Sequence, residues 1–261
     1  MPPIDSLPPG SFCWIELATV DQTAAKQFYS SLFGWSFVDS PMGPDEIYTM
    51  FKLQGRDAGA AYTLNQAMRE QGVPPNWSLY VSSESADDTV QAALDAGGRA
   101  IAGPFDVSDY GRMAVLQDPT GVMISVWQPM RHAGFGISGD PGTLCWADLS
   151  TPDPDAATNF YNAAFGWSFE MGQDGSDYLH IKNGDTFIGG VPPAGMRSPG
   201  APPHWLIYML VADCDQSAAQ AKQLGARLYL EPMTMENVGR MAVVADPQGA
   251  VFALFQPAPR P

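Results

Sequence analysis

The sequence predicts an α+β fold in which one module occurs twice in tandem. Each module is expected to consist of paired βαβββ units that form a curved mixed sheet with helices on its outer face. Three observations predict this fold. The pentapeptide FGWSF occurs at residues 33–37 and again at 165–169. Each half combines strand-like stretches with two helix-like stretches that carry an apolar stripe. The turn sequences DPTG and DPQG recur near the ends of the two halves.

The repeat runs through nearly the whole chain. Trp14 matches Trp146, 132 positions later, and the same offset relates the two FGWSF segments. Towards the end of each half the offset falls to 128. The second copy is therefore shorter in its middle, which places the deletion in loops. A register shared over this length indicates a tandem duplication. We predict a first module over residues 10–129, a linker over 130–141 and a second module over 142–257.

The first strand and helix of each module are expected from alternation and capping. Residues 12–18 alternate so that Trp14 and Glu16 share one face, while apolar side chains occupy the other. Asp21 is expected to cap a helix that carries an apolar stripe and ends at Gly34. The second module repeats this pattern.

The remaining elements of the first module follow in order. Strands are expected over residues 48–53, 58–62 and 76–82. Ser85 is placed to cap a second helix that ends near Asp95. Two final strands flank the DPTG turn, and the second module repeats this arrangement around DPQG.

Composition and charge exclude several classes of function. The chain has 261 residues, with 28 acidic and 13 basic side chains and a net charge of −15. No basic stripe is available to neutralise phosphates, so we expect no nucleic-acid partner and no docking to an anionic membrane. The first residues lack a signal-peptide pattern, and no apolar run reaches the ~18 residues of a membrane-spanning helix. Three cysteines without CxxC spacing fit a reducing compartment, so a cytoplasmic location is expected.

These features make the sequence similar to the vicinal oxygen chelate superfamily of glyoxalases, bleomycin-resistance proteins and extradiol dioxygenases. The resemblance is carried by the strand, Asp-capped helix and FY…FG stretch at 14–34 and 146–166, by the second-helix segment at 211–228, and by the DPxG turns. Within the superfamily the chain most resembles the two-module glyoxalase-like antigens of actinobacteria. They share the first-strand Trp, a P-P-x-W stretch and a GR…DPxGA ending. The resemblance implies paired βαβββ modules that each curl around a cavity.

The resemblance also implies a metal site in each module, with ligands on three strands. Carried over by register, these positions hold Trp14, Ser78 and Ser125 in the first module and Trp146, Leu206 and Ala253 in the second. None of them is the His, Glu or Gln that such a metal would need. We therefore expect no metal and no other cofactor. One alternative rebuilds a divalent metal site in the second module from Asp148, His180 and His204.

The side chains that alternation directs into the two cavities are aromatic, polar and acidic. They are Trp14, Glu16, Ser78, Tyr80, Ser125 and Trp127 in the first module, and Trp146, Asp148, His204, Tyr208 and Phe255 in the second. Aromatic faces beside a carboxylate suit a planar or cationic organic ligand, through stacking and cation–π attraction. The alternative is that the Trp side chains simply fill the concavity of each sheet.

Glu16 and Asp148 have two interpretations. As catalytic residues they would serve as general bases beside the tyrosine on the neighbouring strand. As structural residues each would form an ion pair with Arg112 or Arg240, which recur at the same position of the two modules. Those two arginines could instead bind the carboxylate of a substrate.

The favoured hypothesis is a metal-independent protein that binds a small aromatic or cationic molecule. The alternative is a lyase, isomerase or dioxygenase that acts on a small molecule in the cavity of one module. The second module would then carry the chemistry, because it holds His180 and His204. The expected assembly is a monomer whose modules pair within the chain, or a homodimer.

Overall fold

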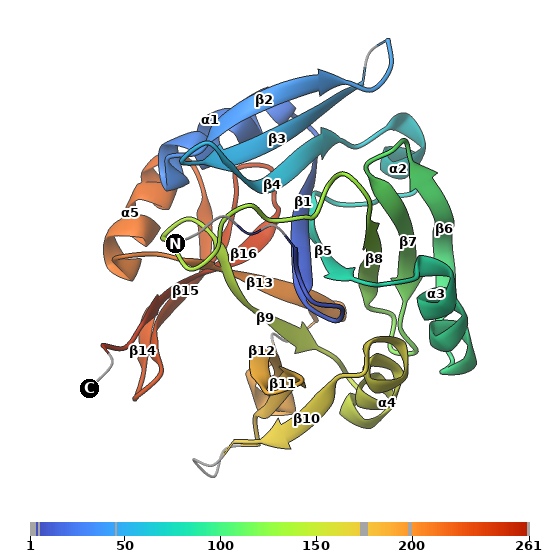
Figure 1. Cartoon of the computed structure of the whole chain (residues 1–261). Coiled ribbons are helices and arrows are strands. Elements are labelled where there is room, and N and C mark those ends of the chain that lie inside the picture. Colours follow the sequence, from blue (N-terminus) through green and yellow to red (C-terminus); the bar gives the residue numbers. More distant parts are fainter. Residues whose placement is uncertain (1–3, 5, 45, 173–176, 198–199, 260–261) are drawn as a thin grey trace.

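Two modules of the same build follow one another along the chain (Figure 1). The computed structural model describes residues 4, 6–44, 46–172, 177–197 and 200–259. In the first module these residues form, in order, β1 Phe12–Thr19, α1 Gln22–Phe33, β2 Ser36–Pro41, β3 Ile47–Leu53, β4 Arg56–Thr63, α2 Gln66–Glu70, β5 Asn76–Ser82, α3 Ala86–Asp95, β6 Arg99–Val107, β7 Gly111–Gln117 and β8 Met123–Pro129.

The second module repeats these elements, with a short 3₁₀ helix, η1, in the place of α2. They are β9 Leu144–Ser150, α4 Pro154–Phe165, β10 Ser168–Met171, β11 Leu179–Asn183, β12 Thr186–Val191, η1 Ala194–Met196, β13 His204–Leu210, α5 Cys214–Gln223, β14 Arg227–Met235, β15 Gly239–Ala245 and β16 Val251–Pro257.

Each module contains one eight-stranded mixed sheet with the same strand order. The order is β2-β3-β4-β1-β5-β8-β7-β6 in the first module and β10-β11-β12-β9-β13-β16-β15-β14 in the second. The central strand β1 pairs in parallel with β4 and in antiparallel with β5, which joins the two βαβββ units of the module. The predicted α+β fold, its paired βαβββ units and its tandem duplication are confirmed.

The helices begin and end where the capping residues predict. The Asp21 carboxylate accepts a hydrogen bond from the Ala24 amide, and Gly34 ends α1 with a φ of 70°. The Ser85 hydroxyl accepts from the Asp88 amide at the start of α3. No helix was expected from the sequence between β4 and β5, but α2 forms there because the Asn65 side chain caps it.

The modules pair through a core that both of them build. Helix α1 packs against α5, and α3 packs against α4 (Figure 1). Tyr29 Oη of α1 donates to Asp246 of the second module at 2.9 Å, and Trp77 Nε1 donates to Tyr29 Oη at 3.1 Å. The equivalent Trp205 Nε1 donates to Tyr161 Oη at 3.0 Å. The aspartate of each DPxG turn thus anchors a tyrosine of the other module.

The tryptophans of the two FGWSF segments lie inside this shared core. Trp35 is 2% exposed and its Nε1 donates to the carbonyl of Gly142, while Trp167 is fully buried and donates to the carbonyl of Gly10. The repeated motif therefore stabilises the pairing of the modules. None of the helices formed by the described residues is long and apolar enough to cross a membrane.

Candidate functional site

The second module has a buried carboxylate, Asp148, on the concave face of its sheet. Three donors converge on it. Tyr178 Oη lies 2.5 Å and Trp146 Nε1 3.1 Å from Oδ1, and Tyr208 Oη lies 2.6 Å from Oδ2. Asp148 itself is 7% exposed. Donors of this kind are what a buried carboxylate requires, so these four residues form one satisfied polar unit, here called the Asp148 cluster.

Neighbouring strands position this cluster. Alternation along β9 directs Trp146 and Asp148 to one face, and the antiparallel register of β13 places Tyr208 opposite Trp146. Gly190 of β12 is the register partner of Asp148. A Cβ at Gly190 would lie 2.0 Å from Tyr178 Oη. The glycine therefore leaves the space through which the Tyr178 phenol reaches the carboxylate.

Burial dominates the electrostatics of the Asp148 cluster. Loss of water raises the pKa of Asp148, and the hydrogen bonds from Tyr178, Tyr208 and Trp146 oppose this shift only in part. The nearby His180 also favours the ionised form. The pKa values of Tyr178 and Tyr208 are raised, first by burial and then by the charge of Asp148. Both phenols therefore stay protonated and donate to the carboxylate.

The first module contains the same unit around Glu16. Tyr80 Oη donates to Glu16 Oε2 at 2.8 Å, and Tyr48 is also hydrogen-bonded to this carboxylate. Trp14 Nε1 donates to Tyr48 Oη at 3.3 Å. Burial raises the pKa of Glu16, and the two tyrosines lower it by a smaller amount. These four residues, the Glu16 cluster, correspond one by one to the Asp148 cluster.

The linker covers the tryptophan of the Glu16 cluster. Its backbone crosses the beginnings of β1 and β4, where the Phe135 amide donates to the Cys13 carbonyl (Figure 1). The rings of His132 and Phe135 lie 4.7 Å and 5.6 Å from the Trp14 ring, centroid to centroid. Trp127 Nε1 donates to the His132 carbonyl at 2.8 Å. Trp14 is consequently 4% exposed and belongs to the main core.

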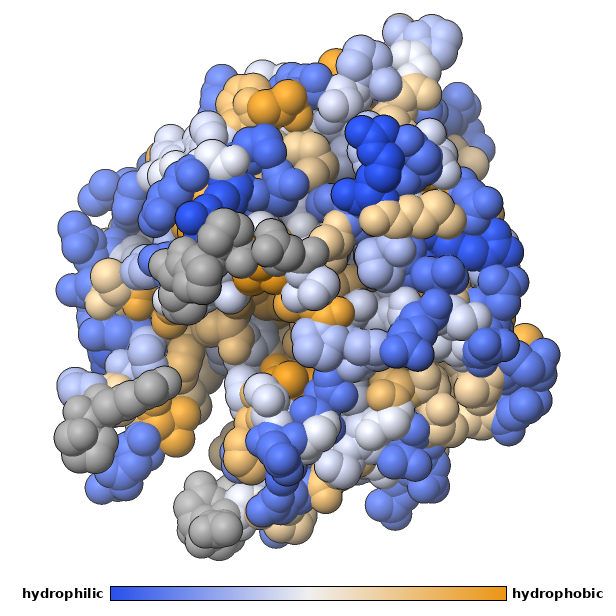
Figure 2. Space-filling model, in the orientation of Figure 1, coloured by the Kyte–Doolittle hydropathy of each residue, from blue (hydrophilic) through white to orange (hydrophobic). Residues whose placement is uncertain are grey.

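The corresponding face of the second module is more open among the described residues, because its tryptophan, Trp146, is only half-buried. Tyr208, Met241 and Ala253 form a small apolar cluster of their own, separate from the main core, and the half-buried Trp146 and Phe255 pack against it. The space-filling view shows a hollow between the β14 hairpin and strands β10–β12, with apolar residues along its wall (Figure 2). The two clusters differ chiefly at the tryptophan, because Trp146 is half-buried whereas Trp14 is buried.

The other predicted residues of the concave faces lie beside the clusters. Ser78 is the register partner of Glu16, and Ser125 is the register partner of Tyr80. In the second module the Phe255 ring packs edge-on against Tyr208, with centroids 6.2 Å apart.

Comparison with known proteins identifies the family to which both modules belong. The sequence profile of the Glyoxalase/Bleomycin resistance protein/Dioxygenase superfamily matches residues 11–126 and again residues 143–254. The chain belongs to this superfamily. The protein CFP32 of Mycobacterium tuberculosis, which is named as a candidate glyoxylase, is 40% identical over 251 residues, or 95% of each chain. The anthracycline biosynthesis protein DnrV of Streptomyces peucetius is 33% identical over 262 residues, or 95% of this chain and 94% of DnrV.

The fold of the superfamily extends to a metalloenzyme of low sequence identity. The Mn(II)-bound glyoxalase of Novosphingobium aromaticivorans has a TM-score of 0.66 to this chain and covers 95% of it, with 82% of its own chain matched. The sequences are 14% identical. This likeness concerns the fold alone.

The residues at the metal-ligand positions of the superfamily do not fit a metal in this chain. Trp14 and Trp146 offer only an indole N–H, which is a donor, and it is directed at the clusters. The side chains of Leu206 and Ala253 contain no donor atom for a metal. Ser78 and Ser125 offer only neutral hydroxyl oxygens. None of the six positions thus holds the imidazole or carboxylate ligands of the metal sites that the resemblance implies.

The alternative metal site from Asp148, His180 and His204 is not assembled either. Among the described residues, no three His, Cys, Asp or Glu side chains are grouped so that they could hold a metal ion. His204 lies at the start of β13, where its Nδ1 is hydrogen-bonded to the Pro202 carbonyl at 2.8 Å. His180 packs edge-on against Trp146 and Tyr178.

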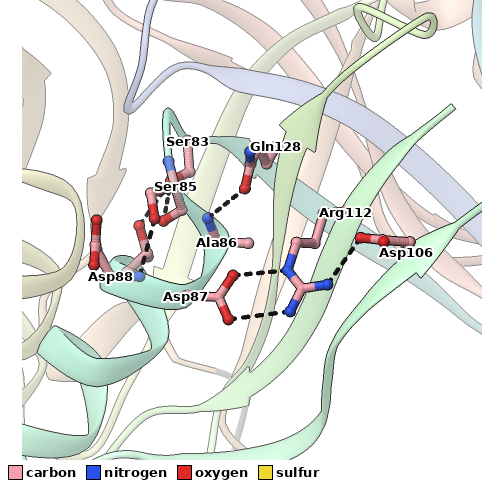
Figure 3. Close-up of polar contacts among 9 residues, drawn as sticks. Ser83, Ser85, Ala86, Asp87, Asp88, Asp106, Arg112 and Gln128 are labelled. Atoms are coloured by element: carbon pink, nitrogen blue, oxygen red, sulfur yellow. Dashed lines mark hydrogen bonds and ion pairs between the residues drawn. The ribbon is translucent and has the colours of Figure 1, made fainter. Parts of the chain in front are cut away.

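The predicted ion pairs of Glu16 and Asp148 with Arg112 and Arg240 are wrong. Figure 3 shows the Arg112 guanidinium bound to both carboxylate oxygens of Asp87, at 2.7 and 3.0 Å, and to Asp106 at 2.8 Å. Arg240 binds Asp215 in the same way. The carboxylates of Asp87 and Asp215 lie in the first turns of α3 and α5.

The arginines bind helix carboxylates, and not Glu16 or Asp148, because of where the fold places the charged groups. Arg112 lies on β7, three strands away from β1 in the sheet, while the helix that carries Asp87 packs directly over β7. The arginine therefore holds a helix to the sheet. Glu16 needs no cation, because phenols satisfy it.

Sequence reasoning missed Tyr48, Tyr178 and the linker residues that cover the first cluster. The two tyrosines lie 130 positions apart, between the offsets that relate the two ends of each module. A signal was therefore present in the repeat. The positions of His132 and Phe135 carried no such signal, because the linker has no counterpart within the repeat.

Proposed function

We propose that the open concave face of the second module binds a planar aromatic molecule without a metal ion. The observation that carries this proposal is the partly exposed aromatic surface around the Asp148 cluster. Trp146 and Phe255 are half-buried there, and Leu206 and Met241 extend the apolar wall. An apolar, aromatic surface with a few convergent polar groups is the usual composition of a site for a small organic ligand.

The hydrogen bonds of Asp148 favour an aromatic over a cationic ligand. The carboxylate already accepts from Tyr178, Tyr208 and Trp146, so its charge is compensated inside the protein. A ligand cation would have to compete with these three donors. An aromatic ring needs only the apolar wall, and it gains from burial and from edge or stacking contacts with Trp146.

The names of two relatives agree with an aromatic ligand. DnrV, and DauV of a second Streptomyces strain, which is 32% identical over 264 residues, are both anthracycline biosynthesis proteins. Anthracyclines contain a planar, fused aromatic ring system. The same type of chromophore would fit a face built from Trp146 and Phe255.

Fluorescence titration tests the proposal with quinizarin, a planar dihydroxyanthraquinone. Quinizarin is expected to quench the Trp emission saturably, and Trp146→Phe to weaken binding by about tenfold. The matched control is Trp14→Phe, which changes the equivalent residue beneath the linker and should leave the affinity unchanged. Absence of saturable binding, or equal effects of the two substitutions, would contradict the proposal.

A second candidate function is general-base catalysis by Asp148. It is favoured by the raised pKa of this carboxylate, because a more basic carboxylate abstracts a proton more readily. The name given to CFP32 points the same way. Turnover would then be expected with the hemithioacetal of methylglyoxal or with a catechol.

The catalytic alternative is tested by assaying both substrates with and without added divalent metal. Asp148→Asn should lower turnover by at least about a hundredfold if the carboxylate is the base. Glu16→Gln is the matched control in the covered module and should leave turnover intact. Turnover that survives Asp148→Asn would remove this candidate.

A further inference from the structure

We propose that the ligand of the second module carries a hydroxyl group that donates a hydrogen bond, and that Tyr208 and Tyr178 select for this donor. The inference rests on the proposed function, because it concerns the molecule that the open face binds. The class of ligand is a planar aromatic compound with a free phenolic hydroxyl, as opposed to its ether or its quinone.

The hydrogen bonds within the Asp148 cluster all point inward. An ionised carboxylate only accepts, so the O–H groups of Tyr178 and Tyr208 both point towards Asp148. The Trp146 N–H is directed inward too, at Asp148 and at Tyr178 Oη, 2.9 Å away. Every polar hydrogen of the cluster is therefore used within the cluster.

The groups of the cluster that remain for a ligand are lone pairs on oxygen. A phenolic oxygen that donates its hydrogen keeps lone pairs that can accept. Tyr178 Oη already accepts from Trp146. Within the described part of the chain, no donor reaches Tyr208 Oη. The polar centre of this face thus offers acceptors: Tyr208 Oη accepts from no described donor, and Asp148 Oδ2 accepts from Tyr208 alone.

The donors of the first module are directed inward in the same way. Tyr80 donates to Glu16, Tyr48 is hydrogen-bonded to the same carboxylate, and Trp14 donates to Tyr48. The arrangement occurs on two independent sets of strands. It is therefore a property of the repeated cluster and not of one side-chain conformation.

One neighbouring side chain could donate to a ligand from outside the cluster. His180 lies beside Tyr178, with ring centroids 5.0 Å apart, and its imidazole carries an N–H. The equivalent residue of the first module is Met50. His180 pairs with Gly190, the register partner of Asp148, and Met50 pairs with Ala60, the register partner of Glu16. Replacing His180 by Met separates its contribution from that of the tyrosines.

Selection follows from the cost of mismatched polar groups. A ligand hydroxyl placed at Tyr208 Oη donates to a free lone pair. A methyl ether or a carbonyl oxygen at the same place would oppose one acceptor with another and leave both without a hydrogen. Such a ligand keeps its ring contacts and loses the polar contact.

Naphthol and its methyl ether test this inference, since they differ only in the donor. Isothermal titration at about pH 8, well above the ordinary pKa of a carboxyl group, is expected to show naphthol binding about tenfold more tightly than the ether. Tyr208→Phe should weaken naphthol binding to the level of the ether and leave ether binding unchanged. Tyr80→Phe, the equivalent change in the covered module, should leave the tenfold preference in place, and so should His180→Met.

The outcomes separate the inference from the proposed function. Equal binding of naphthol and its ether would overturn the inference and leave aromatic binding standing. A preference that persists in Tyr208→Phe but disappears in His180→Met would also overturn it, because the histidine would be the partner of the hydroxyl. Binding of neither compound would remove the proposed function and this inference together.

Discussion

The two modules contain corresponding clusters of a tryptophan, a carboxylate and two tyrosines, but the tryptophan is more exposed in the second module than in the first. The linker lays His132 and Phe135 over Trp14, whereas Trp146 is half-buried on an open face. The first cluster is continuous with the main core, and the second has a small apolar cluster of its own. The polar cluster occurs in both modules, and the linker, which is not repeated, distinguishes the two copies.

This difference suggests a division of roles. A buried carboxylate is stable when phenols donate hydrogen bonds to it, so the first cluster can form part of the core. The corresponding cluster of the second module lies beside a half-buried apolar surface, where we propose that a ligand binds. Substitutions in the two modules are therefore expected to have different effects.

Removing the linker ring that covers Trp14 should lower the free energy of unfolding more than removing a ring from the concave face of the second module. Phe135→Ala deletes a ring that is 6% exposed and packs on Trp14, so the free energy of unfolding should fall by about 3 kcal/mol. Phe255→Ala, on the open face, should cost about 1 kcal/mol, because its ring is only half-buried. Urea denaturation measures both. Equal losses would show that the faces are equally packed.

Filling the space at Gly190 should disturb the second cluster. Gly190→Ala places a Cβ against Tyr178 Oη, which must move away from Asp148, and we expect a loss of about 1–3 kcal/mol in thermal or urea unfolding. The register-equivalent residue of the first module is already Ala60. Ala60→Gly should therefore change stability less. A tolerated Gly190→Ala would mean that Tyr178 can reach Asp148 by another route.

The pH dependence of stability should report the buried carboxylate. Burial raises the pKa of Asp148 in the folded chain above its ordinary value near 3.8. The stability contribution of such a group is fully present below that ordinary value and is lost as the pH rises through the raised folded pKa. Asp148→Asn should therefore lose less stability than the parent chain between about pH 4 and neutrality.

Unfolding free energies measured across this range check the sign. Glu16→Gln should act in the same direction, because burial raises the pKa of Glu16 as well. If the parent chain instead gains stability relative to Asp148→Asn as the pH rises, the three hydrogen bonds outweigh burial.

The smallest effect is expected at His132. Its Nε2 is buried without a hydrogen-bond partner, and burial lowers the pKa of the ring. His132→Phe keeps an aromatic ring against Trp14 and removes the unpartnered nitrogen, so we expect unchanged stability or a gain of up to about 1 kcal/mol. A clear loss in chemical denaturation would indicate a partner that this nitrogen needs.

The fold could be predicted in detail because its signals are local and occur twice. Asp21, Gly34 and Ser85 act through their own backbone neighbours, so their roles as caps follow from the sequence. Alternation likewise assigned Trp14 and Glu16 to one face of β1. The short α2 helix was missed because Asn65 is one capping residue in a segment without apolar periodicity.

The candidate site was predicted only in part. The sequence identified both carboxylates and the tyrosine on the adjacent strand. One of its two interpretations of these carboxylates, the ion pairs with Arg112 and Arg240, was wrong, since both arginines bind the first turns of helices. Charge alone cannot show which acidic group lies above which strand.

By itself, the sequence determined the duplication, the strand and helix order and the face on which Glu16 and Asp148 lie. These properties depend on periodicity and on contacts within a few residues along the chain. The tertiary structure decided which groups satisfy the carboxylates and which cluster stays open. Those outcomes depend on strand register, on the space left by Gly190 and on the path of the linker, which bring together residues that are distant in sequence.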